Sequence, residues 1–432
     1  MPKKFYIKTF GCQMNVYDGL RITAMLKRHG YVHTDDVSDA DIILLNTCAV
    51  RAKATEKVYS ALGRIRLAKK KDAIYGIVGC VARESGSDAF RKLKDLNFVL
   101  GPQSYHKLPE ILEDPNTKLL DINLGGLEKF DELPPITKSP LVAYIPVQEG
   151  CNHCCTYCIV PYTRGPEISR PYSDVMAETM HAAEVGAIEI CFLGQNVNGY
   201  KFNDENGKTY RLSDVIKATA QIDSVKRIRF TSSYPTEMTD DLIELFGTEK
   251  KLLPFLNMPI QSGSDDVLKR MHRQYTIAEY MAIIDKFKTI RPDIQISSDF
   301  IVGFPGESND DFEQTMQAAK RVGYINSFSF KYSPRPHTAA AIMQNQIPEN
   351  IKSERLIKLD DLLNERQREF NLSCIDKTFE CLYEGPDKTG KKHIYRTPYM
   401  QPCIVATDNP TSLATIKITS ANKSCLHGEM LD

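Results

Sequence analysis

The sequence predicts an α/β protein with an N-terminal parallel α/β domain, a central partial TIM-like barrel of six β/α units, and a small C-terminal β-barrel. Two long blocks in which apolar strands alternate with amphipathic helices indicate the first two units. Short strands separated by turns at the end of the chain indicate the third. A length of 432 residues, 42% of them hydrophobic, is ample for two or three cores.

The composition restricts the partners that the chain can have. The 55 basic residues balance 55 acidic ones, so a nucleic acid must be bound by a local basic patch. The start, MPKKFYIKTF, passes from charge into a strand pattern without the apolar segment of a signal peptide. Apolar runs such as DIILL are far shorter than the about 20 residues of a membrane span. We therefore expect a cytoplasmic protein without a membrane partner, whose cysteines are metal ligands or buried thiols.

The first block, residues 1–130, contains three apolar strands that each end in a cysteine. The stretches KKFYIKTFGC, ADIILLNTC and AIYGIVGC place Cys12, Cys48 and Cys80 directly after strands. Because the carboxyl ends of parallel strands meet at one edge of a sheet, these three thiols are expected to lie close together.

A break and two further blocks follow. The stretch KFDELPPITKSP, residues 129–140, reads as a linker because two adjacent prolines interrupt any regular element. Residues 141–370 repeat strand and helix six times, from LVAYIPV to NSFSFKYS, and predict the barrel. Residues 371–432 predict the small β-barrel.

Four cysteines crowd into the stretch EGCNHCCTYCIVPYTRG, and two interpretations compete for them. As two C-x2-C pairs, Cys151 with Cys154 and Cys155 with Cys158 fit zinc, but structural zinc sites usually separate their pairs by a dozen residues or more. As C-x3-C-x2-C, the residues Cys151, Cys155 and Cys158 bind one iron–sulfur cluster and Cys154 stays free. This spacing after the first barrel strand resembles that of the radical S-adenosylmethionine (SAM) enzymes.

Three thiolates leave one iron of a 4Fe–4S cluster without a protein ligand. In the radical SAM enzymes that iron chelates the amino and carboxylate groups of SAM, and an electron from the cluster cleaves SAM to a 5′-deoxyadenosyl radical. The same count applies to Cys12, Cys48 and Cys80, which predicts a second 4Fe–4S cluster with an open iron in the N-terminal domain.

The chain resembles the methylthiotransferases, and within them the MiaB family of tRNA-modifying enzymes. The motifs that carry the resemblance run along nearly the whole chain: TFGCQMNVYDG, LLNTCAVRAKA, GIVGCVARE, GCNHCCTYCIVPYTRG, FLGQNVNGY, MPIQSGSDDVLKRMHR, DFIVGFPGES and FKYSPRPHTAA. The GCQMN and VPYTRG forms resemble the branch that acts on isopentenyl-adenosine in tRNA. The terminal β domain resembles the RNA-binding TRAM domain.

The resemblance implies that a 2-methylthio group is added to N6-isopentenyl-adenosine next to the anticodon. It implies two SAM molecules per turnover, an external electron donor and a sulfur source; we expect a monomer. One alternative keeps the chemistry but acts on threonylcarbamoyl-adenosine of tRNA or on a ribosomal protein. An alternative of another class is a zinc-stabilised RNA-binding protein without catalysis.

Several polar loops after the barrel strands are candidates to bind SAM, the target base or a ribose. They also read as an ordinary polar loop, a helix N-cap and a glycine turn. The candidates for cofactor binding are Gln195, Asn198, Gln261, Ser262, Gly303 and Glu307. Arg164 and Arg335 also lie near strand ends, where each suits either a bound anion or a surface ion pair.

For RNA, the basic helix after Cys48 is the first candidate, although charge runs are more often solvated helix faces. Its cations are Arg51, Lys53, Lys57, Arg64, Arg66, Lys69 and Lys70. In the terminal domain, Tyr383, Tyr395 and Tyr399 suit either base stacking or core packing.

Overall fold

The computed structural model describes residues 2–49, 52–113, 118–124 and 126–431, apart from the side chains of 52–56. Its N-terminal domain is a six-stranded parallel sheet in the order β2-β1-β3-β4-β5-β6. The strands are β1 Lys4–Thr9, β2 Val32–His33, β3 Ile42–Thr47, β4 Ile74–Gly79, β5 Phe98–Leu100 and β6 Leu119–Asp121. The helices are α1 Gln13–Arg28, α2 Ala52–Ala68, α3 Cys80–Ser85, α4 Asp88–Lys92 and α5 Leu108–Glu113.

Apolar packing on both faces holds this sheet in place. Every residue of β3 and β4 is buried, and their alternate side chains enter two separate apolar cores. A strand that is buried on both faces has apolar residues at successive positions, and DIILL and IYGIVG show this pattern. The three cysteines follow β1, β3 and β4 at the carboxyl edge of the sheet, as the sequence predicts.

The segment expected to be a linker is partly a folded element. Residues Glu128–Glu132 form helix α6, and Lys129 and Phe130 are buried. The expectation of a free linker from residue 129 is therefore wrong at its start, because tertiary ion pairs of Lys129 anchor it.

The central unit is an open parallel barrel of six strands, which confirms the expected fold class. Strand β10 pairs with β7 and β13, β14 pairs with β15, and β16 pairs with β17, all in parallel. The barrel strands are β7 Val142–Pro146, β10 Glu189–Leu193, β13 Arg227–Phe230, β14 Phe255–Asn257, β15 Gln295–Ser297 continued by β16 Asp299–Val302, and β17 Phe328–Lys331. Its helices are α7 Val160–Arg164, α8 Tyr172–Glu184, α9 Leu212–Ala220, α10 Asp240–Thr248, α11 Asp265–Arg270, α12 Ile277–Ile290 and α13 Asn309–Val322.

A long helix, α14 Glu349–Ser373, leads from the barrel to the terminal domain. There a closed β-barrel forms in the order β18-β19-β20-β22-β21. Its strands are β18 Thr378–Pro386, β19 His393–Arg396, β20 Pro402–Val405, β21 Leu413–Ala421 and β22 Leu426–Met430. In the described part of the chain, no helix has the length and apolar character that crossing a membrane requires.

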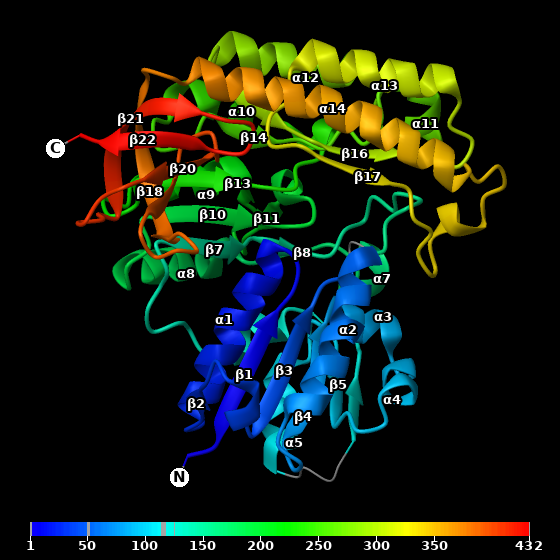
Figure 1. Cartoon of the computed structure of the whole chain (residues 1–432), viewed down its shortest axis with the longest axis vertical. Coiled ribbons are helices and arrows are strands. Elements are labelled where there is room, and N and C mark those ends of the chain that lie inside the picture. Colours follow the sequence, from blue (N-terminus) through cyan, green and yellow to red (C-terminus); the bar gives the residue numbers. More distant parts are fainter. Residues whose placement is uncertain (1, 50–51, 114–117, 125, 432) are drawn as a thin grey trace.

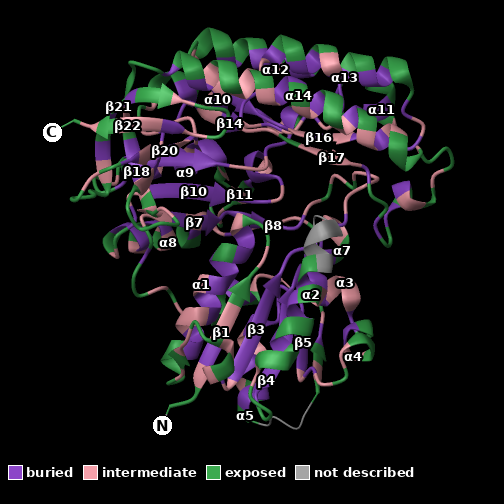
Figure 2. Cartoon of the chain, viewed as in Figure 1, coloured by how far each residue is buried: buried purple, intermediate pink, exposed green. Residues whose placement is uncertain are grey.

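The N-terminal domain meets the central barrel through the amino end of α1 (Figure 1). Met14 packs against Cys191 and Leu193 of β10, and Thr231, just after β13, donates a hydrogen bond to Gln13 over 3.4 Å. Figure 2 shows buried residues continuing from the sheet through this contact into the barrel. The carboxyl edge of the first sheet, which bears the cysteines, thus faces the central barrel.

Candidate active site between the N-terminal domain and the barrel

The first group of thiols lies where three strands of the N-terminal sheet end. Cys12 is the N-cap of α1, Cys80 is the first residue of α3, and Cys48 follows β3. A hydrogen bond with Cys48 and the charge of Arg164 lower the pKa of Cys12 to about 6. Burial raises the pKa of Cys80, Arg164 opposes that rise, and the charge of Cys12 adds to it. The structure thus places Cys12 and Cys80 at helix amino ends, with Cys48 in hydrogen-bond contact with Cys12.

Glycines allow this close approach. Gly11 has φ +120°, and a Cβ at that position would stand 2.1 Å from the Cβ of Cys48. Gly79, with φ +93°, would place a Cβ 2.5 Å from the carbonyl oxygen of Thr47. The glycine before each of two cysteines is therefore required for the strand ends to converge.

Two buried asparagines orient Cys12. The Cys12 thiol donates to Asn15 Oδ1 over 3.1 Å, and Asn15 Nδ2 donates to Asn46 Oδ1 over 2.8 Å. Asn46 returns a 2.7 Å hydrogen bond to the Asn15 carbonyl, and both side chains are fully buried. The sequence analysis did not single out these residues, although Asn15 stands three positions after a cysteine at a helix start.

The second group of thiols lies on a closed loop between β8 Gln148–Glu149 and α7. Strand β8 pairs with β9 Ile168–Ser169, which holds the two ends of the loop together. Burial raises the pKa of Cys151 to about 11 and that of Cys158 to about 12, and the charge of Cys155 raises both further. Cys154 has φ +51° and is exposed. Cys151, Cys155 and Cys158 are therefore neighbours, and Cys154 points to solvent.

An arginine contacts one sulfur in each group; Arg164 is buried and Arg273 is half-buried. Arg164 Nε donates to Cys80 Sγ over 3.3 Å, and Arg273 Nη1 donates to Cys155 Sγ over 3.7 Å. Arg273 also stacks over Tyr234, whose ring lies flat on His153 at 3.7 Å between centroids. Hydrogen bonds to sulfur and surrounding dielectric are the means by which a protein tunes an iron–sulfur cluster.

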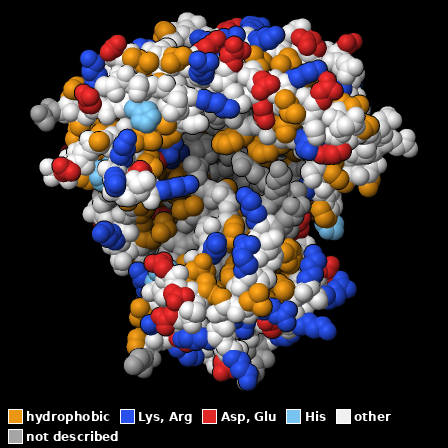
Figure 3. Space-filling model, in the orientation of Figure 1, with side chains coloured by type: hydrophobic (Ala, Val, Ile, Leu, Met, Phe, Trp, Pro, Cys, Tyr) orange, Lys and Arg blue, Asp and Glu red, His pale blue; other side chains and the backbone are white. Residues whose placement is uncertain are grey.

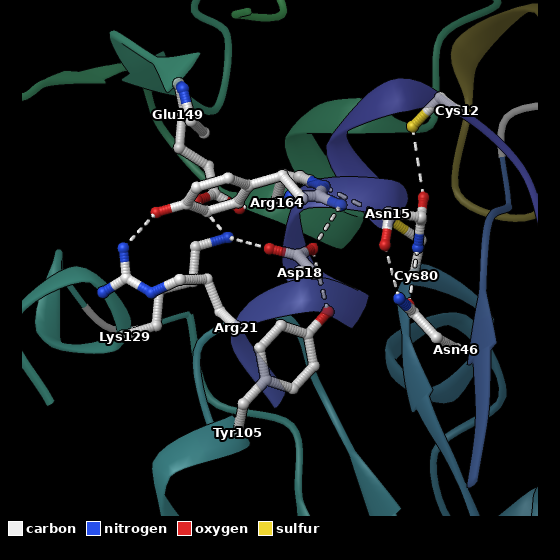
Figure 4. A network of polar contacts seen from close by, with 12 residues as sticks. Cys12, Asn15, Asp18, Arg21, Asn46, Cys80, Tyr105, Lys129, Glu149 and Arg164 are labelled. Atoms are coloured by element: carbon white, nitrogen blue, oxygen red, sulfur yellow. Dashed lines mark hydrogen bonds and ion pairs between the residues drawn. The ribbon is translucent and has the colours of Figure 1, made fainter. Parts of the chain in front are cut away.

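A buried charge network joins the two domains around Arg164 (Figure 4). Arg164 binds Glu149 at 2.6 Å and Asp18 at 3.3 Å, and Lys129 binds the same two carboxylates at 2.6 and 3.1 Å. Tyr105 adds a 3.1 Å hydrogen bond to Asp18. The sequence suggested Arg164 as an anion-binding residue or as part of a surface ion pair, but it is buried and pairs with carboxylates of both domains. The sequence analysis did not single out Lys129, Asp18 or Glu149.

The donor sets fit iron–sulfur clusters better than a single ion. Each group offers three thiols and an N–H donor to sulfur, without a carboxylate or imidazole ligand. Over the described residues, no three His, Cys, Asp or Glu side chains are arranged to hold one metal ion. A cubane spreads its thiolates over separate irons and needs a wider arrangement of ligands.

The cofactor candidates occupy the loops after the barrel strands, and several already have protein partners. Gln195 Oε1 accepts from the Gly150 amide at 2.5 Å. The side chain of Asn198 donates through Nδ2 to the carbonyl of Tyr234 and accepts through Oδ1 from its backbone N–H. Glu307 accepts from the Gly303 amide at 2.9 Å and from Arg355 at 2.7 Å.

Two further candidates lie after β14. Ser262 is 1% exposed and its hydroxyl lies 3.3 Å from that of Thr315. Gln261 has φ +67°, and its backbone bonds Asp299 and Ile301. Binding of SAM by any of the six candidates remains a prediction.

The basic helix is α2, and its cations differ in whether they pair with an acidic side chain. Arg51 lies outside the described residues, and so does the side chain of Lys53. Arg66 pairs with Asp95 at 3.4 Å, Lys70 pairs with Asp41 at 2.8 Å, and Lys69 lies over the Tyr75 ring. Lys57 and Arg64 are exposed and, within the described part of the chain, have no ion-pair partner. Figure 3 shows Lys and Arg side chains bordering the hollow between the two domains.

The three tyrosines of the terminal domain are mainly packing residues. Tyr395 is fully buried, Tyr383 packs beside it, and Tyr399 contacts Phe370 and Phe379 edge-on. Base stacking on Tyr395 is therefore excluded by its burial in the barrel core.

Comparison with known proteins gives the class first. Residues 4–101 match the family described as "Uncharacterized protein family UPF0004", and residues 145–319 match the Radical SAM superfamily. The fold is similar to that of the radical SAM methyltransferase TsrM from Kitasatospora setae, with a TM-score of 0.55 at 11% identity over 79% of this chain and 77% of that one. The radical SAM enzyme OxsB gives a TM-score of 0.51 at 10% identity over 84% and 56%. The central unit is a radical SAM barrel, whose superfamily uses SAM and a 4Fe–4S cluster.

Full-length relatives give the family. The tRNA-2-methylthio-N(6)-dimethylallyladenosine synthase of Rickettsia rickettsii is 45% identical over 100% of both chains. The proteins of that name from Zymomonas mobilis and Bartonella bacilliformis are 44% and 43% identical, over 100% and 99% of this chain and 97% and 96% of theirs. The chain belongs to the tRNA-2-methylthio-N(6)-dimethylallyladenosine synthase family, which confirms the family expected from its motifs.

Proposed function

We propose that this chain is the radical SAM methylthiotransferase that adds a 2-methylthio group to N6-isopentenyl-adenosine next to the anticodon of tRNA. The carrying observation is that Arg164, at the end of the helix that follows Cys158, donates to Cys80 of the N-terminal domain. The segments that bear the two groups of three cysteines therefore meet at the domain interface. A protein with one radical centre needs one such group, so the second group supports an insertion of sulfur.

Cys151, Cys155 and Cys158 would hold the radical SAM cluster, and Cys12, Cys48 and Cys80 a second 4Fe–4S cluster. When bound, the first cluster supplies the electron that cleaves SAM and the second supplies the sulfur that is methylated and transferred. Two SAM molecules are used per turnover, with an external electron donor and a sulfur source. The protein works as a monomer in the cytoplasm, where its tRNA substrate is found.

The protein's own residues hold this arrangement in place. Asn15 and Asn46 orient the Cys12 thiol, and Arg164 and Arg273 direct N–H groups at Cys80 and Cys155. The Asp18–Lys129–Glu149–Arg164 network fixes the distance between the two domains. Gln195, Gln261 and the turn at Gly303 stand where a ligand above the barrel strands would be met.

Iron and sulfide content of anaerobically purified protein tests this function. We expect about eight irons, falling to about four when Cys12, Cys48 and Cys80 are changed to Ala. Reductive SAM cleavage should survive in that variant, while formation of the 2-methylthio isopentenyl nucleoside is lost. Zinc in place of iron, or an unchanged iron content in the triple variant, would contradict the proposal.

A further inference from the structure

A cavity of about 600 Å³ lies at the loop that follows β17. Residues 334–339 with Ala341 and Ile342 form one side and Tyr162 of α7 the other. This volume suits a ligand the size of a nucleotide, since small-molecule pockets occupy about 300–1,000 Å³. None of the cluster cysteines and none of the six cofactor candidates lines it.

Hydrogen bonds connect the two sides of the cavity to the segments that carry the two groups of thiols. On the barrel side, the Ala340 amide donates to the carbonyl of Thr156 over 2.8 Å, within the loop of Cys155 and Cys158. On the other side, Arg83 Nε donates to the Tyr162 carbonyl over 3.2 Å, three residues after Cys80 in α3. A ligand here would therefore touch residues that are joined to the segments of both thiol groups.

Arg335 lines the cavity, and two nitrogens of its guanidinium are buried beneath this surface. Arg335 is 9% exposed, and its Nε and Nη2 are buried without a hydrogen-bond partner among the described residues. Glu84 approaches Nη1 only to 4.0 Å. Leaving buried charged donors without hydrogen bonds is costly, so a turn of this side chain toward the cavity would be favoured by an anion such as a phosphate.

Exposed rings stand at the mouth of the same cavity. Tyr162 is 46% exposed, and its ring lies 5.8 Å from that of the exposed His337. The loop that carries His337 is held by a 2.8 Å hydrogen bond from the Thr338 hydroxyl to the Arg335 carbonyl. A preorganised aromatic surface next to a phosphate-binding arginine is the arrangement that single-stranded RNA requires.

We propose that this cavity binds a nucleotide of the anticodon loop that flanks the target adenosine, with its base on Tyr162 and its phosphate on Arg335. The inference rests on the proposed function, because it takes tRNA as the substrate. It explains why an exposed tyrosine and a buried arginine line one cavity although they are 173 positions apart in the printed sequence. Among the described residues, Nε and Nη2 of that arginine have no hydrogen-bond partner.

The test uses the cluster-loaded protein and anticodon stem-loops that contain isopentenyl-adenosine. In two separate probes, 2-aminopurine replaces the nucleotide immediately before or immediately after the target. For one of them, binding to the wild type should quench the fluorescence by stacking. Tyr162→Ala should remove that quenching and raise the Kd about 10-fold or more. Tyr162→Phe should restore both, since its ring still stacks.

Arg335→Gln should reduce the slope of log K against log salt by about 0.7, the value of one phosphate contact on a single strand. Tyr31→Ala, at the opposite edge of the N-terminal sheet, is the matched control and should bind as the wild type does. Unchanged Kd and quenching in Tyr162→Ala would overturn the proposal, as would weakened SAM binding without RNA in Arg335→Gln at unchanged RNA affinity. A wild type that binds the probe but forms no methylthio nucleoside would instead refute the proposed function.

Discussion

Arg164 Nε donates a hydrogen bond to Cys80 Sγ over 3.3 Å, from the end of a barrel helix to the start of a helix in the N-terminal domain. The same guanidinium binds Glu149 and Asp18, so it is fixed in position by carboxylates from both domains. Burial raises the pKa of Cys80, and the positive charge of Arg164 opposes that rise. A charge of the barrel thus influences the pKa of a thiol in the N-terminal domain.

Arg164→Lys should lower the reduction potential of the cluster that we propose at Cys12, Cys48 and Cys80. Lysine keeps the charge but loses the planar fork that reaches Cys80 and both carboxylates. N–H donors to sulfur favour the more negative, reduced state, so their loss makes reduction harder. A redox titration followed by electron paramagnetic resonance measures the shift. Arg170→Lys is the control, since Arg170 bonds Glu178 and the Pro146 carbonyl and no cysteine. Equal potentials in both variants would contradict a role for the Cys80 contact.

Lys129→Met should destabilise the protein by about 3–5 kcal/mol, because it leaves two buried carboxylates with too few cations. Lys129 is 1% exposed and binds Asp18 and Glu149 at once. The free energy of unfolding from urea titration measures the loss. Lys286→Met removes an exposed pair with Asp240 and should cost less than about 1 kcal/mol. A loss in Lys129→Met as small as that of the control would show that the network adds no stability.

The free energy of unfolding should fall in acid because Glu189 loses its charge there. Burial alone would raise its pKa, but Arg229 and Arg227 outweigh burial and hold the pKa below its ordinary value of 4.5. As the pH falls, the Glu189 carboxylate is therefore protonated at a higher pH in the unfolded chain than in the folded protein. The stabilisation is complete above about pH 4.5 and is lost as the pH falls through the folded pKa.

Urea unfolding at a series of pH values measures this effect. Glu189→Gln should flatten that part of the stability curve, whereas Glu354→Gln on the exposed face of α14 should leave it nearly unchanged. An identical acid slope in Glu189→Gln and in the wild type would contradict the assignment.

Changing Lys57 and Arg64 together to Ala should weaken tRNA binding and reduce its salt dependence by roughly one to two units of log–log slope. Both side chains are exposed on α2 and have no acidic partner in the described part of the chain. Arg66 and Lys70 on the same helix are already paired with Asp95 and Asp41, so their double Ala variant is the matched control and should have a smaller effect. Equal effects from the two pairs would indicate that α2 does not select RNA through its free cations.

Local sequence patterns were sufficient for the architecture. The strands that precede Cys12, Cys48 and Cys80 are apolar runs ending at a turn, and the structure has them as β1, β3 and β4 of one parallel sheet. Helix α13 has its limits at Asn309 and Val322, because the Ser308 side chain caps it and Gly323 ends it in the left-handed region. These features depend on neighbours in sequence, which is why they could be predicted.

Contacts between distant segments could not be predicted in this way. Lys129 was read as part of a linker because the prolines that follow it are a strong local signal, yet Asp18 and Glu149 bury it completely. Asn198, read as a ligand-binding side chain, is bound to the backbone of Tyr234. In each case the partner stands at least 20 positions away, beyond the reach of any periodicity.

The sequence by itself determined the order of strands and helices along the chain, the positions of the six cysteines and the family of the protein. Each of these depends on spacing and local pattern. Only the tertiary structure decided which partners the arginines have. Arg164 donates to Cys80 and Arg273 donates to Cys155. Nε and Nη2 of Arg335 are buried without a hydrogen-bond partner among the described residues. Burial gives these groups their strength, because a charge removed from water interacts strongly with whatever the fold places beside it.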